Sequence, residues 1–219
     1  MKWKSIPDLI SDDNVYYNRS GKKSETQAMR NFHNLVIKKD LIMSVSSPND
    51  TLIDTSVGKA GDMSKWIAAK LSFVFGLDIS RDNIYNKMDG ACARYISTKE
   101  KYKHKKEKIF DALFVQSNSS LNIRDGNACF TDKCKQIINA VFGKGTKDIN
   151  KLGKGVYKNF GKGENGFNIV STQFALHYFF ENKNTLHSFL RNISECCKVG
   201  GYFIGTCYDG NKIFRKLES

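Results

Sequence analysis

The chain has 219 residues, with 35 Lys and Arg against 22 Asp and Glu, a formal net charge of +13. This length suffices for one sizeable core, and the two Pro and absence of long polar tracts argue against disorder. No run approaches the ~20 apolar residues of a membrane span, and polar sequence follows Met1–Lys4, so we expect neither a membrane helix nor a signal peptide. The basic excess favours a polyanionic partner such as RNA, although a basic surface without a specific ligand would give the same composition.

Cysteines occur six times, and no two form a Cys-x-x-Cys pair. The sequence therefore indicates neither a zinc site nor a redox motif, and we expect reduced thiols in a cytosol-like compartment.

The N-terminal part is expected to form an extended arm over residues 1–23, followed by a helix. Ser24 and Gln27 have the spacing of a capping box, which predicts a helix from Ser24 to about Met43. Apolar residues at helical spacing give this helix one apolar side. They are Met29, Phe32, Val36, Ile37 and Leu41.

Beyond this helix, short apolar runs alternate with helical patterns. The predicted strands are residues 52–54, 73–78, 112–115, 167–171 and 202–206. The predicted helices are residues 63–71, 82–98, 136–142 and 186–193. The Gly- and Lys-rich segment 151–166 is expected to be a mobile loop, and the Lys-rich segment 99–108 a solvated face, with RNA contact as the alternative. This alternation predicts an α/β fold with a central, mostly parallel sheet and helices on both faces.

Two acids mark the ends of the first two predicted strands, where such sheets bind ligands. Asp54 is followed by small residues at positions 56, 58, 60 and 61, which would let a ligand approach the backbone. The turn lacks a full Gly-x-Gly-x-x-Gly pattern, and a tight turn without a ligand would look similar. Asp78 can accept hydrogen bonds from both hydroxyls of a ribose, or instead cap the next helix in competition with Ser80 and Asp82. Together the two acids favour a nucleoside site.

Five segments in order resemble the mRNA cap guanine-N7 methyltransferase family, as in the multifunctional capping enzymes of large DNA viruses. They are residues 29–42, 54–66, 76–95, 167–181 and 200–210. The most specific is Gln173–Tyr178, whereas the turn after Asp54 is shared by class I methyltransferases broadly. The resemblance implies a class I, Rossmann-like domain over residues 24–219 that transfers the methyl group of S-adenosylmethionine to N7 of the guanine cap of mRNA.

The resemblance also implies a set of residues that bind S-adenosylmethionine. They are Lys38, Asp54, Gly58, Asp78, Asn118 and Gln173. Lys38 would approach the methionine carboxylate, unless Lys39 or a one-residue shift in the helix takes its place. Asn118 stands where the family often has an Asp near the adenine, and an amide can still donate and accept hydrogen bonds there.

A second implied set binds the cap. Phe174, His177 and Tyr178 would hold the guanine, and Lys59 and Arg94 would meet the cap phosphates. If a helical turn starts near Gln173, the three aromatic residues fall at i, i+3 and i+4 on one face. Aromatic faces suit a guanine that becomes cationic on methylation. Taken alone, Phe-x-x-His-Tyr is more often part of a core, and Lys59 more often a surface lysine.

The chemistry needs no catalytic acid or base and no metal. Guanine N7 has a lone pair and no proton to remove, so catalysis rests on positioning. Two alternatives stay open: a class I methyltransferase acting on another RNA base or a small molecule, and a non-catalytic cap- or RNA-binding fragment of a capping enzyme.

The resemblance further implies a setting for the chain. Its partners would be capped RNA and guanylyltransferase and triphosphatase modules of the same polypeptide, in the host cytoplasm, a viral factory or the virion. The family domain adds strands after the fifth that have no counterpart here. We therefore expect a C-terminally shortened domain with an open sheet edge.

Overall fold

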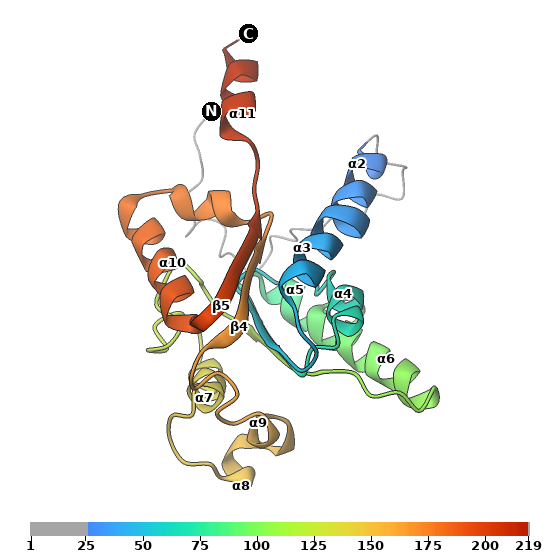
Figure 1. Ribbon diagram of the computed structural model, residues 1–219. Helices are drawn as coiled ribbons and strands as arrows, with labels where there is room; N and C mark the ends of the chain where they lie inside the picture. Colours follow the sequence, from blue (N-terminus) through green and yellow to red (C-terminus); the bar gives the residue numbers. More distant parts are fainter. Residues whose placement is uncertain (1–25, 219) are drawn as a thin grey trace.

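The computed structural model describes residues 26–218, and its centre is a sheet of five strands (Figure 1). The strands are β1 (Thr51–Asp54), β2 (Phe73–Asp78), β3 (Asp111–Gln116), β4 (Phe167–Gln173) and β5 (Cys197–Thr206). They lie in the order β3-β2-β1-β4-β5, and all four pairings are parallel. The winding reverses between β1 and β4, so the switch point lies at the carboxyl ends of these two strands. The predicted parallel sheet is thus confirmed.

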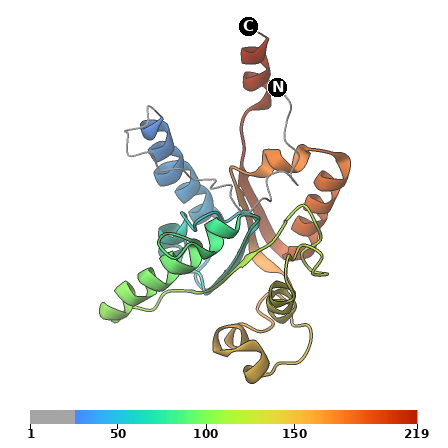
Figure 2. The same cartoon turned by 180° about the vertical axis from the view of Figure 1, so that it is seen from behind.

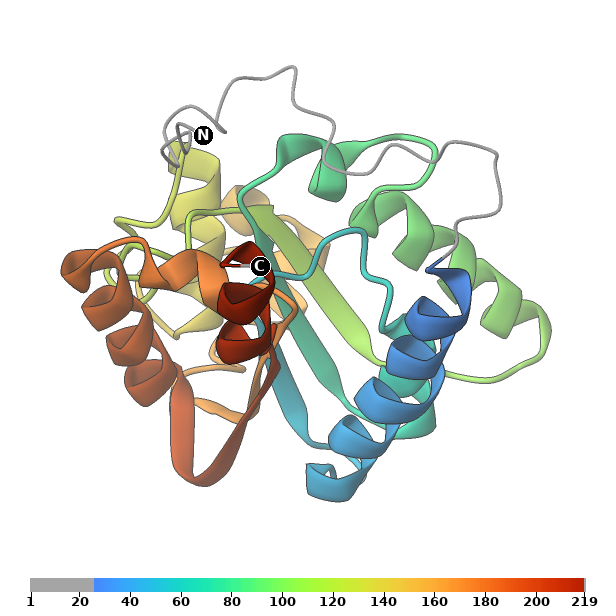
Figure 3. The same cartoon turned by 90° about the horizontal axis from the view of Figure 1, so that it is seen from above.

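Helices cover both faces of this sheet, as Figures 2 and 3 show from two further directions. One face packs on α3 (Lys38–Val45), α4 (Met63–Ala68) and α6 (Ala91–His104). The opposite face packs on α7 (Asp132–Val141) and α10 (Lys183–Cys196). Side chains alternate along β1, so Leu52 joins the first core and Ile53 the second. Burial on both faces explains why the strands read as continuous apolar runs.

The predicted N-terminal helix is present but is not regular. It consists of α2 (Gln27–Phe32), a π-helical turn η1 (His33–Ile37) and α3. The expected capping residue Ser24 and the 1–23 arm lie outside the described residues. The helix projects from the sheet in Figure 1, and most of its expected apolar side is therefore exposed, with Met29 and Phe32 both 54% accessible.

The prediction of one helix over residues 82–98 is wrong, because α5 (Arg81–Tyr85) and α6 are separate. The side-chain oxygen of Asn86 accepts hydrogen bonds from the backbone N–H groups of Met88 and Asp89, which forms a turn. Gly90 follows in an extended conformation, and a Cβ there would lie 2.7 Å from the Asn86 backbone. The second helix continues to His104 and includes six of the ten residues of the Lys-rich segment 99–108.

The expected mobile loop at residues 151–166 is also a wrong prediction. Two short helices, α8 (Ile149–Leu152) and α9 (Lys154–Lys158), occupy its first half and the residues before it. Leu152 and Val156 are buried against Ala140 of α7 in a small separate core. The remaining elements are η2 (Leu176–Phe180), a 3₁₀ helix after β4, and α11 (Gly210–Leu217) after β5. None of the described helices is long and apolar enough to cross a membrane.

Candidate cofactor and cap site

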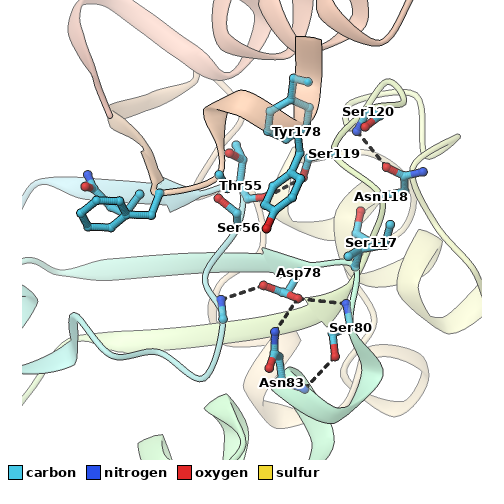
Figure 4. A pocket seen from close by; sticks show the side chains of 16 residues that line it. Thr55, Ser56, Asp78, Ser80, Asn83, Ser117, Asn118, Ser119, Ser120 and Tyr178 are labelled. Carbon is cyan, nitrogen blue, oxygen red and sulfur yellow. Dashed lines mark hydrogen bonds between the residues drawn. The ribbon is translucent and has the colours of Figure 1, made fainter. Parts of the chain in front are cut away.

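A pocket opens at the carboxyl ends of β1 to β4, next to the switch point of the sheet (Figure 4). The loops after β1, β2, β3 and β4 line it, together with α5 and η2. The residues are Thr55, Ser56, Gly58, Asp78, Ile79, Ser80, Asn83, Ser117, Asn118, Ser119, Ser120, Gln173, Phe174, Ala175, Tyr178 and Phe179. The pocket therefore combines polar loops on one side with aromatic rings on the other.

Asp78 is buried at the end of β2 and accepts three hydrogen bonds from the protein. Its Oδ1 accepts from Ser80 N at 2.9 Å and from Asn83 Nδ2 at 3.0 Å, and its Oδ2 accepts from Gly58 N at 2.7 Å. A carboxylate has about four acceptor sites, so about one is left for a ligand hydroxyl. Burial raises the pKa of Asp78, and these donors oppose the rise. The cap of α5 is Ser80, whose Oγ accepts from Asn83 N.

The turn after β1 has an unusual backbone. Gly58 has φ +54° and Ala60 has φ +53°, the left-handed region that favours glycine. A Cβ on Gly58 would meet nothing within 4 Å, so the glycine matters for its backbone conformation rather than for space. The buried Oγ of Ser56 in this turn has no hydrogen-bond partner among the described residues. Because buried hydroxyls are nearly always paired, this pocket-lining oxygen fits contact with a polar ligand.

Asp54 lies beneath this turn and does not line the pocket. Its carboxylate accepts from Ser56 N at 3.1 Å and from Ser171 Oγ at 3.3 Å. Burial raises the pKa of Asp54 to about 7, and the neighbouring carboxylate of Asp62 adds to the rise. Asp54 therefore titrates close to neutral pH.

Lys38 points toward the same region from the N-terminal helix. Its Nζ lies 3.1 Å from Asp62 Oδ2 and 5.4 Å from the centre of the Phe174 ring. The exposed Lys39 makes neither contact. The helix contains a π turn just before Lys38, in which Lys38 N donates to His33 O, five residues back. His33 thereby shares a face with Lys38, and its ring lies 5.3 Å from that of Phe174.

Asn118 and Gln173, both predicted to bind the cofactor, line the pocket. Asn118 Oδ1 accepts from Ser120 N at 3.0 Å and so shapes the loop after β3. The Gln173 amide is held at both ends, since Nε2 donates to Ser171 Oγ at 3.3 Å and Oε1 accepts from Thr206 Oγ1 at 3.0 Å. Gln173 is thus fixed in orientation against the pocket.

The three aromatic residues predicted for the guanine come together, although not as one helical face. Phe174 has φ +56° and precedes η2, so the expected i, i+3, i+4 arrangement is wrong. The rings meet through Tyr208 instead, whose centre lies 4.9 Å from His177 and 6.5 Å from Phe174. His177 and Tyr178 are in contact, with centres 4.3 Å apart.

Sequence reasoning assigned no role to Tyr208 or to His33. Tyr208 belongs to the last of the five resembling segments, and its place just after β5 was the signal available. His177 is partly buried, which lowers its pKa, and its Nδ1 has no partner among the described residues. A neutral imidazole with an unsatisfied nitrogen suits contact with a heterocyclic base.

Lys59 and Arg94, the residues predicted for the cap phosphates, differ in whether they form ion pairs with carboxylates of the described residues. Lys59 Nζ lies 2.9 Å from Asp82 Oδ2 and 2.8 Å from Asp89 Oδ1, and its side chain is only 11% exposed. Arg94 lies half-buried in the first turns of α6 and has no carboxylate within 4.0 Å among residues 26–218. Within the described part of the chain, no group of three His, Cys, Asp or Glu side chains is placed to hold a metal ion.

Comparison with known proteins identifies the class. The family model for the mRNA (guanine-N(7))-methyltransferase domain matches residues 12–219, so the chain belongs to that family. Its fold is the class I, Rossmann-like methyltransferase fold, and S-adenosylmethionine is the cofactor of that class. A solved structure of a Pyrococcus horikoshii OT3 protein shares the fold, with a TM-score of 0.50 and 15% identity over 94% of this chain and 71% of that one.

Curated relatives agree with the family. A probable mRNA-capping enzyme of Acanthamoeba polyphaga mimivirus is 28% identical over 93% of this chain and 16% of its own length. The mRNA cap guanine-N(7) methyltransferase of Drosophila melanogaster is 30% identical over 90% of this chain and 40% of its own length. The chain thus spans less than half of these relatives, and the viral relative is much longer than one methyltransferase domain.

Proposed function

We propose that this domain transfers the methyl group of S-adenosylmethionine to N7 of the guanine cap of mRNA. The observation that best supports this proposal is that two chemically different walls line one pocket. One wall holds Asp78 and the loops after β1 and β3, and the other holds Phe174 and Tyr178, with His177 behind them. A nucleoside cofactor and a purine substrate are the two ligands that these walls suit.

The cofactor, when bound, supplies an electrophilic methyl group; the residues of this chain supply position. Asp78 offers its remaining acceptor site to a ribose hydroxyl, and Ser56 and Asn118 offer polar groups beside it. Lys38 and Asp54 lie outside the pocket lining, and we assign them a supporting role on the methionine side: Lys38 contacts Asp62 at the end of the turn after β1, and Asp54 accepts from Ser56 N in that turn. The aromatic residues hold the guanine plane, which orients N7 and excludes water. No side chain has to accept a proton, because N7 has none.

The experiment is methyl transfer from labelled cofactor to RNA with an unmethylated cap. Label in the 7-methylguanosine released by nuclease digestion is the expected result, with uncapped RNA of the same sequence as the control. Label on internal bases, or labelling that excess cap analogue does not suppress, would instead identify a methyltransferase for another substrate. Cap binding without any cofactor binding by calorimetry would identify a non-catalytic cap-binding fragment.

The proposal extends to the setting of the domain. The 16% coverage of the mimivirus relative supports a role beside other capping modules, namely a triphosphatase and a guanylyltransferase in the same polypeptide. Such an enzyme would act where the transcripts are made, in the cytoplasm of a host cell, in a viral factory or within the virion.

A further inference from the structure

We infer that one face of α6 binds the phosphodiester backbone of the RNA just downstream of the cap. This inference rests on the proposed function, because it takes the cap to lie in the pocket described above. It assigns a role to the Lys-rich segment 99–108, which the cap site itself does not use.

The first observation is the register of the basic residues on α6. Arg94 and Lys101 are seven residues apart in α6, so they lie along one side of the helix with Thr98 between them, and Lys105, the C-cap residue, follows four residues later and extends the row. At about 1.5 Å per residue the row is roughly 16 Å long, or about five nucleotides at a rise of about 3.4 Å each. A row of that length fits a short stretch of single-stranded RNA.

The second observation is that this row carries uncompensated charge. Lys101 and Lys105 are exposed, and among the described residues no carboxylate lies within 4.0 Å of either Nζ. The other two lysines of the helix differ, since Lys99 lies 3.7 Å from Asp111 Oδ1 and Lys103 lies 3.9 Å from Glu100 Oε2. Glu100, the acid within this part of α6, contacts Lys103 and so does not neutralise the row.

The third observation is where the row begins. Gly90, the N-cap of α6, directly follows Asp89, whose Oδ1 contacts Lys59 in the turn of the cofactor pocket. Arg94 lies one turn into the helix, and α6 then runs along its face of the sheet, away from the carboxyl ends of the strands (Figure 1). The row therefore leads away from the edge of the candidate site, as the path of a bound RNA would.

A purely structural role for these lysines predicts something different. Cations near the C-terminus of a helix favour its dipole, which would affect stability and not RNA length dependence. An acidic protein partner would need the charge but not the cap. Both explanations can be separated from RNA binding by one set of variants.

The experiment compares Lys101→Gln/Lys105→Gln with a matched control, Lys151→Gln/Lys154→Gln, which removes the same charge from α8 and α9, two helices that pack on α7 on the other face of the sheet. Kd is measured by fluorescence anisotropy over a salt series, with a capped 12-nucleotide RNA and with a capped dinucleotide. We expect the α6 pair to weaken the long RNA about tenfold and to lower the log–log salt slope by about 1.4, or about 0.7 per lost phosphate contact. Binding of the capped dinucleotide should stay unchanged.

Unchanged binding of the long RNA by the α6 pair would overturn the inference, and so would an equal loss with the control pair. Equal weakening of the dinucleotide would do the same, since it would indicate damage to the pocket. Because binding is measured without turnover, absence of methyl transfer would refute the proposed function while leaving this test readable.

Discussion

The backbone N–H of Gly58 donates a 2.7 Å hydrogen bond to Oδ2 of Asp78, which joins the turn after β1 to the end of β2. Twenty residues separate the two, and each was predicted separately to contact the cofactor. The bond means that they form one unit. A ligand hydroxyl that approaches Asp78 meets an acceptor whose position depends on the left-handed conformation of Gly58.

We therefore expect Asp78→Asn to damage both binding and folding. The amide NH₂ would face one of the three donors that now point at the carboxylate. This should lower the free energy of unfolding by about 1–3 kcal/mol. The Kd for S-adenosylmethionine should rise at least tenfold in calorimetry under conditions where the variant stays folded. Asp132→Asn, at an exposed position of α7, is the control; a normal Kd for Asp78→Asn would refute the assignment.

The raised pKa of Asp54 predicts a pH dependence with a definite sign. Its folded pKa of about 7 exceeds its ordinary value of 3.8, so the folded protein binds the extra proton between these values. Asp54 therefore lowers the free energy of unfolding as pH rises from about 4 to about 7. The free energy of unfolding should be measured by denaturant at pH 5 and pH 8. Between these values the wild type should lose on the order of a few kcal/mol that Asp54→Asn keeps, because the variant has no carboxyl group at this position. Equal pH slopes in the two proteins would contradict this.

Tyr208 should matter for the cap and not for the fold. The side chain is 58% exposed, so Tyr208→Ala should remove little packing from the core. Because the ring contacts His177, the same substitution removes one wall of the aromatic cluster. Loss of one stacked ring predicts about a tenfold rise in Kd for a cap analogue, with Kd for the cofactor unchanged. Tyr202→Ala is the matched control, at a similarly exposed tyrosine of β5, 54% accessible. If both variants behave alike, Tyr208 has no part in the site.

The ion pair of Asp89 with Lys59 allows a test of the phosphate assignment in which a substitution should increase the affinity for capped RNA. Asp89 holds Lys59 Nζ at 2.8 Å and would compete with a phosphate for it. Asp89→Asn should lower the Kd for capped RNA a few-fold, in line with the modest energies of partly exposed ion pairs, and leave the Kd for the cofactor unchanged. Lys59→Met should raise the Kd for capped RNA. Unaltered RNA affinity in both variants would leave Lys59 with only a structural role.

Much of the fold could be predicted from the sequence, because buried parallel strands consist of runs of apolar residues. Asp54 and Asp78 were found for the same reason, since each ends such a run. The break at Gly90 was also readable, because Asn86 and Gly90 are both turn residues, but the apolar spacing across residues 82–98 favoured one helix. The short helices α8 and α9 were missed because tertiary packing of Leu152 and Val156, not local composition, holds them.

The site was less predictable where it depends on backbone conformation. A phenylalanine does not by itself indicate the left-handed conformation that Phe174 adopts, so helical spacing was the natural expectation. Tyr208 looks like any exposed tyrosine until β5 places it beside His177. The ion pair of Lys59 with Asp89 depends on the turn at residues 86–90, which the predicted single helix concealed.

The π turn between His33 and Ile37 gives the N-terminal helix one residue more than a regular α-helix would hold in the same length. Each residue of a regular helix turns the chain by about 100°, so loss of that extra residue would swing everything before it around the axis by that angle. His33 would leave Phe174 while Lys38 stayed at Asp62. The one extra residue of the π turn therefore lets a single helix contact both sides of the site, Phe174 through His33 and Asp62 through Lys38.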